Sequence, residues 1–207
     1  MLHKMTCVLL RAAALFAVTA ALAHAHHVMD YAQPATALDG LLSGLAHPLI
    51  GVDHLLFVLG AGVLAARIER GHLLPFLFVA ASVAVAGMRY LGVNVELSEL
   101  WIAGSLVVLG AILLATRVLS GGATAVLFIV AGALHGYALA EAIVGAERTP
   151  LVAYVVGLTV IQSAIALSAW WLAGWLAAHR PRVPVQRLAG ASIGVAGLAF
   201  SALAAFS

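Results

Sequence analysis

The sequence predicts an all-α membrane protein, a compact bundle of six transmembrane helices that follows a cleaved signal peptide. Of the 207 residues, 64% are hydrophobic and only 9% are charged, whereas a soluble domain carries about 25% charged residues. The mean hydropathy is +1.12. Six apolar segments approach the ~20 residues that a helix needs to cross a hydrocarbon core. The chain is therefore expected to lie in a lipid bilayer.

Residues 1–25 have the pattern of an export signal. Lys4 and Arg11 precede the apolar run 12–22, and 23–25 read Ala-His-Ala, the small-x-small pattern of a signal peptidase site. The alternative is an uncleaved first transmembrane helix. Cys7 is the only cysteine and would leave with the signal, so the mature chain would have neither a disulfide nor a thiolate ligand.

Residues 26–47 are expected to form a periplasmic N-terminus and a short amphipathic helix. His26 and His27 would stand beside the new terminal amine, where imidazoles can capture a divalent transition-metal ion. The alternative is that these terminal histidines are incidental. The helix is predicted over Thr36 to Ala46, with Thr36 as N-cap and Asp39 in the first turn.

Residues 48–207 are predicted to form a six-helix transmembrane permease domain. Pro48 is expected to break the backbone before the first span. The predicted spans are Pro48–Ala66, Leu73–Leu91, Leu100–Leu119, Ala123–Val144, Leu151–Ala177 and Val185–Phe206.

The arginines predict the orientation of the chain in the membrane. With the mature N-terminus outside, six arginines fall in or beside inner loops and two fall outside, as the positive-inside rule requires. The inner set is Arg67, Arg70, Arg117, Arg180, Arg182 and Arg187, and the outer set is Arg89 and Arg148.

The first span begins with ionisable residues. His47, Asp53 and His54 lie within eight residues at the outer end of an apolar run, and ionisable groups inside a membrane usually mark a functional site. An unbroken helix would separate the two histidines by about 10 Å along its axis. A bend at Pro48 and Gly51 would either let both imidazoles converge or leave them as successive stations on one path.

The fourth span carries His135 and Glu141, and its outer end shares a depth with the outer end of the first. We therefore predict a metal site made of His47, Asp53, His54, His135 and Glu141, a donor set suited to borderline divalent ions. The structural alternatives are a bond from His135 to a backbone carbonyl and an ion pair from Glu141 to Arg148. Tyr137, Gln162 and Ser163 are candidates to line the path of the ion.

These residues resemble the HupE/UreJ permeases associated with hydrogenase and urease operons. The motif H-P-x-x-G-x-D-H is present as His47, Pro48, Gly51, Asp53 and His54, with Gly62 after seven further residues. The resemblance extends over the whole chain, including the second motif of His135, Gly136 and Glu141. It implies metal handling by His47, Asp53 and His54, and nickel or cobalt as cargo. Members often carry a histidine in the fifth span, where this chain has Gln162 and Ser163.

The sequence therefore predicts a secondary transporter that imports a divalent metal ion, nickel or cobalt, across the bacterial inner membrane. No permanent cofactor is expected, and the partners are membrane lipid and the transported ion. The absence of a P-loop argues against nucleotide hydrolysis. The small and scattered net charge of +2 argues against nucleic acid. The ion would be driven by the membrane potential or by coupled protons.

Two other functions fit part of the pattern, although we expect no enzyme activity. An intramembrane hydrolase would use zinc held by histidines, or Ser43 or Ser163 with a histidine. However, the chain has no H-x-x-x-H pair, and the surroundings of Ser43 are not a nucleophile elbow. The other alternative is an accessory membrane protein that binds metal without transporting it.

Overall fold

The computed structural model describes residues 33–93 and 99–206, and within these ranges the chain is helical and contains no strand. The predicted signal peptide, residues 1–25, and the histidines His26 and His27 lie outside the described residues.

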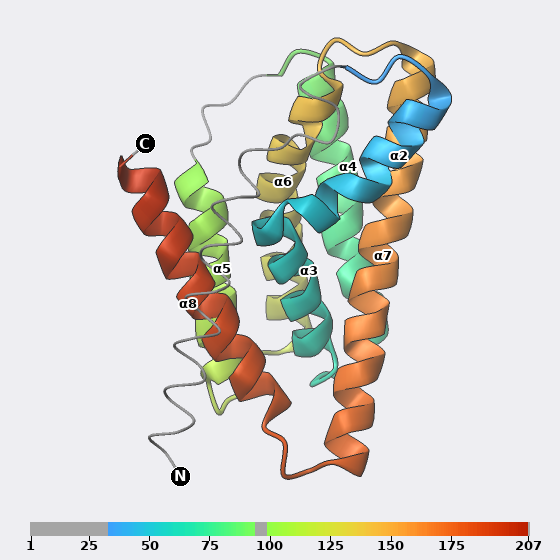
Figure 1. Cartoon of the computed structure of the whole chain (residues 1–207). Helices are drawn as coiled ribbons and strands as arrows, with labels where there is room; N and C mark the ends of the chain where they lie inside the picture. Colours follow the sequence, from blue (N-terminus) through green and yellow to red (C-terminus); the bar gives the residue numbers. More distant parts are fainter. Residues whose placement is uncertain (1–32, 94–98, 207) are drawn as a thin grey trace.

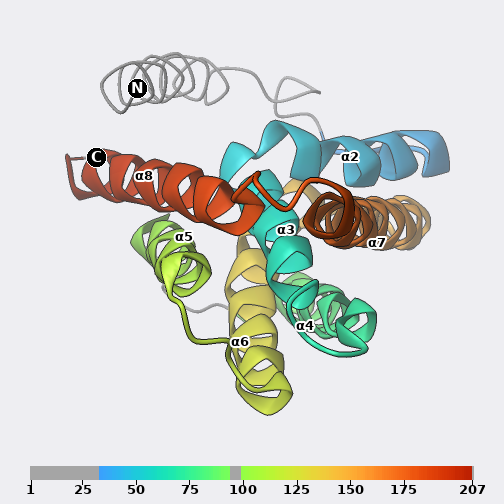
Figure 2. The same ribbon diagram turned by 90° about the horizontal axis from the view of Figure 1, so that it is seen from below.

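Helix α3 lies at the centre of the bundle. The other long helices surround it (Figures 1 and 2), and α2 crosses the upper end in the view of Figure 1. From α3 to α8 the long helices alternate in direction. In chain order the elements are α2 (Ala37–Ile50), α3 (Val52–Ala65), η1 (Gly71–Leu73), α4 (Pro75–Tyr90), α5 (Glu99–Leu114), α6 (Gly121–Leu139), η2 (Ala140–Ile143), α7 (Arg148–His179) and α8 (Val185–Phe206).

Four helical segments of the described chain are long and apolar enough to cross a membrane: Gly71–Tyr90, Gly121–Ile143, α7 and α8. Helices α2 and α3 together would make a fifth span, bent by 77° at its break. Helix α5 is apolar but has 16 described residues. The helices thus fit a multi-pass membrane protein with four or five candidate spans. A helix corresponds to each of the six predicted spans, but six membrane crossings are not confirmed.

Helix α2 begins where the sequence predicts and ends later. The backbone N–H of Asp39 donates to the Thr36 hydroxyl over 3.2 Å, and the N–H of Thr36 donates to the Asp39 carboxylate over 2.9 Å, which forms a capping box. The expected break at Pro48 is wrong, because the helix continues to Ile50 and breaks at Gly51. Pro48 has no N–H for the carbonyl four residues before it and crowds that carbonyl, but such a proline can kink a helix without ending it, and α2 runs two residues past Pro48.

Three helix pairs pack closely through glycine: α5 with α8, α2 with α7, and α4 with α6. A Cβ atom at Gly110 of α5 would lie 2.6 Å from the Cα atom of Gly194 in α8. In the other pairs, backbone oxygens of α7 and α4 occupy the space that Cβ atoms at Gly44 and Gly136 would need. In a bilayer, such close approach provides the van der Waals contact that holds helices together.

The two ends of the bundle differ in charge. The alternating helix directions place Arg89 and Arg148 at the upper end, beside α2, and the six other described arginines at the lower end. At the lower end, the guanidinium of Arg67 also donates to the backbone oxygens of Ala115 and Thr116 over 3.4–3.5 Å. The arginines that the sequence assigns to one side of a membrane therefore do share one end of the structure.

The glycine contact between α5 and α8 is testable. Gly110→Ala should lower the melting temperature measured in detergent, because overpacking of a tight contact costs about 1–3 kcal/mol. Gly104→Ala is the matched control on the same helix, since a Cβ there meets nothing within 4 Å. The control should leave the melting temperature unchanged or raise it, as alanine favours helix over glycine. Equal effects of the two substitutions would contradict this packing.

Candidate functional site

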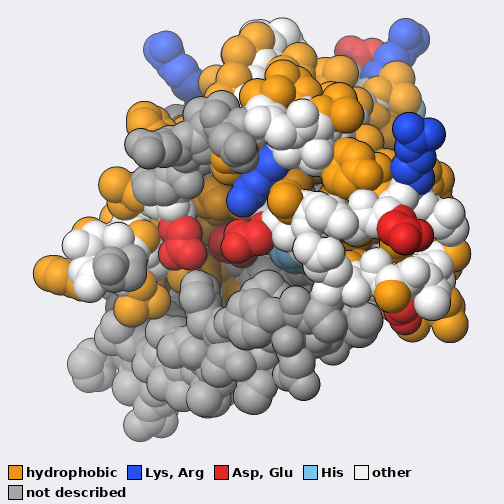
Figure 3. All heavy atoms as spheres, turned by 90° about the horizontal axis from the view of Figure 1, so that it is seen from above, with side chains coloured by type: hydrophobic (Ala, Val, Ile, Leu, Met, Phe, Trp, Pro, Cys, Tyr) orange, Lys and Arg blue, Asp and Glu red, His pale blue; other side chains and the backbone are white. Residues whose placement is uncertain are grey.

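A pocket of about 390 Å³ lies among the helix ends at the upper end of the bundle. From this end, acidic and basic side chains gather around a hollow in which a histidine is visible (Figure 3). The lining residues come from α2, α3, α4, α5, α6, η2 and α8. The polar ones are His47, Asp53, His54, Arg89, Glu99, Tyr137 and Glu141.

The break at Gly51 brings His47 and His54 together. Helix α2 ends and α3 begins at this residue, and the centroids of the two imidazole rings lie 6.1 Å apart. A Cβ atom at Gly51 would lie 2.7 Å from Cδ2 of His54, so a larger residue would displace that ring. The break therefore brings the two imidazoles close to each other, and whether one ion binds both or passes from one to the other stays a prediction.

Asp53 stands in the first turn of α3, where it faces the pocket. Its carboxylate accepts a hydrogen bond of 2.8 Å from the backbone N–H of His54. The same oxygen, Oδ1, lies 3.9 Å from Nε2 of His54. The start of a helix stabilises a negative charge, so the fold supports a carboxylate at this position.

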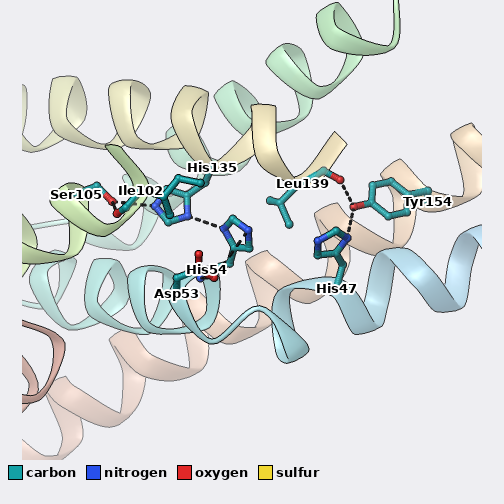
Figure 4. A network of polar contacts seen from close by, with 8 residues as sticks. All are labelled: His47, Asp53, His54, Ile102, Ser105, His135, Leu139 and Tyr154. Carbon is teal, nitrogen blue, oxygen red and sulfur yellow. Dashed lines mark hydrogen bonds and ion pairs between the residues drawn. The ribbon is translucent and has the colours of Figure 1, made fainter. Parts of the chain in front are cut away.

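The hydrogen bonds around His135 assign its protons (Figure 4). The Ser105 hydroxyl lies 2.6 Å from the carbonyl oxygen of Ile102, which has no proton, so the hydroxyl must donate to it. Nε2 of His135 lies 2.9 Å from the same hydroxyl oxygen and must therefore be the donor. In a neutral imidazole, Nδ1 of His135 is then an acceptor, and Nδ1 of His54 donates to it over 2.7 Å.

The same reasoning applies to His47. The Tyr154 hydroxyl donates to the carbonyl oxygen of Leu139 over 2.6 Å, and Nδ1 of His47 lies 3.0 Å from the hydroxyl oxygen. His47 must therefore donate through Nδ1. In Figure 4 one series of hydrogen bonds runs through His135 to His54, and the other, on the opposite side of the view, runs through Tyr154 to His47.

The two series of hydrogen bonds fix the protons of the histidines, and the resulting set of donor atoms is one that can bind a metal ion. In neutral His54 the lone pair is on Nε2, which lies 3.9 Å from Oδ1 of Asp53, and His47 lines the same pocket; imidazole and carboxylate together suit a borderline divalent ion. Within residues 33–93 and 99–206, however, no three His, Cys, Asp or Glu side chains are already arranged to hold a metal ion. His135 is fully buried with both ring nitrogens bonded, so it orients His54, as the residues behind a ligand do.

The other predicted site residues lie in different surroundings. Glu141 is exposed in η2 and lines the pocket with Tyr137, and no ion pair joins it to Arg148 in the described chain. Gln162 is fully buried on α7, and its neighbour Ser163 is half-buried. Helix α6 ends at Leu139, so Glu141 stands beyond the end of the helix that carries His135.

Four polar residues at this site were not predicted as site residues: Ser105, Tyr154, Arg89 and Glu99. Nη1 of Arg89 donates to the backbone oxygen of Tyr137 over 2.6 Å, and its guanidinium lies 4.3 Å from the centroid of the Tyr137 ring. One signal was available, since Arg89 is one of only two arginines on the side that is poor in positive charge. Ser105 gave no signal, because a serine in an apolar helix usually bonds within that helix, and Tyr154 gave none, because a single tyrosine in a span is usual at a membrane interface.

Comparison with known proteins identifies the family. The family model described as HupE / UreJ protein matches residues 12–200, which is most of the chain. Neither the curated proteins nor the solved structures include a match. Because the match spans both histidine motifs and all the described helices through most of α8, the chain belongs to the HupE/UreJ family.

Proposed function

We propose that this protein is a secondary transporter that imports a divalent transition-metal ion, nickel or cobalt, across the bacterial inner membrane. The upper end of the bundle faces the periplasm, and the six arginines of the lower end face the cytoplasm, in line with the positive-inside rule. The ion is cargo rather than a resident cofactor, and the chain is not an enzyme. Family membership supports this proposal.

The observation that carries the proposal is the meeting of His47, Asp53 and His54 at the helix break. Interrupted helices at membrane depth are where transporters commonly build ion sites. The pocket is open at the upper end and is lined by carboxylates, which attract a dication. Imidazole nitrogens then favour nickel, cobalt, copper or zinc over magnesium or calcium.

Ligand atoms that are not already arranged around one point suit the transient binding of an ion during transport better than its permanent retention. With ligand distances of about 2.1 Å, an ion held by both Nε2 of His54 and Oδ1 of Asp53, which lie 3.9 Å apart, would stand almost directly between them, so a compact coordination geometry needs the two atoms to move closer. Conduction requires a site that binds strongly enough to admit an ion and weakly enough to release it. The membrane potential favours inward movement of a dication by about 4.6 kcal/mol per 100 mV.

The hydrogen bonds lend no support to the hydrolase alternative. Ser105 is the serine bonded to a histidine in the described chain, and it resembles a nucleophile beside its base. A nucleophilic serine must give its proton to the base. Here the Ser105 hydroxyl donates its hydrogen bond to the carbonyl of Ile102, and Nε2 of His135 donates to the hydroxyl oxygen. An accessory protein that binds metal without moving it is the remaining alternative, and flux measurements distinguish it.

Uptake by the purified protein in liposomes tests the proposal. Radioactive nickel or cobalt should enter wild-type vesicles, and His54→Ala should reduce the initial rate at least tenfold, because the ion loses a ligand at its first site. His179→Ala, the same chemical change at the exposed lower end of α7, is the control and should transport normally. Competition by unlabelled copper, zinc and iron then ranks the cargo ions. Metal binding without flux by the wild-type protein would establish the accessory role instead.

The role of Tyr154 can be tested by titration calorimetry. Tyr154→Phe removes the acceptor that keeps the proton of His47 on Nδ1, so metal affinity should fall about 10–100-fold, as is usual when such a partner is lost. Tyr90→Phe is the matched control, because the Tyr90 hydroxyl donates to the Ala146 carbonyl over 3.1 Å and does not contact these histidines. Equal losses of affinity in the two variants would show a general effect of lost hydrogen bonds and would contradict the assignment.

A further inference from the structure

In the described part of the chain, two buried polar side chains have atoms without a hydrogen-bond partner. Ser82 in α4 and Gln162 in α7 are fully buried. The hydroxyl oxygen of Ser82 and both amide atoms of Gln162 lack a partner. Thr159 and Ser201, by contrast, bond within their own helices, to the carbonyls of Val155 over 2.7 Å and Gly197 over 2.8 Å. Unpaired polar atoms in a core are costly, so these two residues need another explanation.

The helix repeat places both residues at the level of His135. Residues four apart lie one above the other on a helix. Residues of α4, α6 and α7 meet in an apolar cluster near the upper end, which we call the upper cluster; its members include Ala86, Leu139 and Leu158. One turn toward the lower end, the same three helices carry Ser82, His135 and Gln162.

A second apolar cluster lies one turn further down. This lower cluster includes Phe78, Ala131 and Ala166, which again belong to α4, α6 and α7. Ser82, His135 and Gln162 therefore form one polar layer between two apolar ones. The contacts between helices agree with placing these three residues in one layer. Helix α4 contacts both α6 and α7, and the backbone of Ser82 touches Gly136, the neighbour of His135.

The polar layer begins at the floor of the pocket. His135 bonds to His54, which lines the pocket, and the centroids of their rings are 4.9 Å apart. Beneath this layer, Phe57 and Phe78 stack with their centroids 5.1 Å apart, and both rings contact His135. An ion that leaves His54 toward the lower end thus meets Ser82 and Gln162 before it meets an apolar barrier.

We propose that Ser82 and Gln162 form an inner station for the metal ion, which receives it after the pocket and before the phenylalanine pair. The Ser82 hydroxyl and the Gln162 amide oxygen are neutral oxygen donors, which hold a borderline ion less tightly than imidazole and carboxylate do. The amide N–H groups can bond to water that the ion retains. A weak site after a stronger one allows the ion to move on. This inference rests on the proposed transport function.

Flux and binding, measured on the same full-length variants, test the station. Gln162→Met replaces the amide by an apolar chain of similar size, and Ser82→Ala removes one hydroxyl from a helix that tolerates alanine. Titration with nickel or cobalt should give affinities within twofold of wild type, because the pocket is intact. The initial rate of uptake into liposomes should fall at least tenfold for Gln162→Met and about threefold for Ser82→Ala. The melting temperature should not fall, because unpaired polar atoms are removed.

Thr159→Val on α7 is the control and should match the wild type in uptake, since its hydroxyl serves only its own helix. Wild-type uptake by Gln162→Met or by Ser82→Ala would overturn the station. So would a loss of affinity that parallels the loss of flux, because the residue would then support the pocket instead. If the wild-type protein binds metal but moves none, the transport function itself fails, and that result is seen before any variant is compared.

Discussion

The interruption of the helix at Gly51 is the constraint on which the site depends. A continuous helix would keep His47 and His54 about two turns apart, whereas the 77° bend brings their rings within 6.1 Å. In lipid, an interrupted helix must satisfy its own backbone groups. Here the N–H of Gly51 bonds to the carbonyl of His47 over 2.9 Å, and the carboxylate of Asp53 accepts from the N–H of His54. Residues of the candidate site thus satisfy backbone groups at the break.

The end of α6 then decides which nitrogen of His47 carries the proton. Leu139 is the last residue of α6, and the last carbonyls of a helix lack partners within it. The carbonyl of Leu139 is consequently available to accept a hydrogen bond from the Tyr154 hydroxyl, and the oxygen of that hydroxyl then accepts a hydrogen bond from His47. The end of α6, where η2 begins, therefore determines that His47 on α2 carries its proton on Nδ1, although the two segments are far apart in sequence.

The sequence was sufficient for the helices, for the Thr36 cap and for the group of histidines at the upper end, because each of these leaves a local pattern. It was insufficient for Ser82, Ser105 and Tyr154. Their roles depend on how each helix is rotated about its axis, and spans that are apolar on every side give little periodicity from which to predict that rotation. Pro48 misled the prediction for a different reason, since a proline within a helix can kink it without ending it.

The charged residues at the pocket mouth attract cations in general, and they do not distinguish one metal ion from another. Three carboxylates, from Asp53, Glu99 and Glu141, face one guanidinium, from Arg89, and such a mouth concentrates every cation near it, abundant magnesium included. At physiological ionic strength the attraction is screened within about 8 Å, so it governs how often ions arrive. Under the proposed transport function, discrimination against the abundant hard cations would therefore fall to the imidazole nitrogens below the mouth, and a change confined to the acidic rim would alter the rate of capture more than the choice of metal.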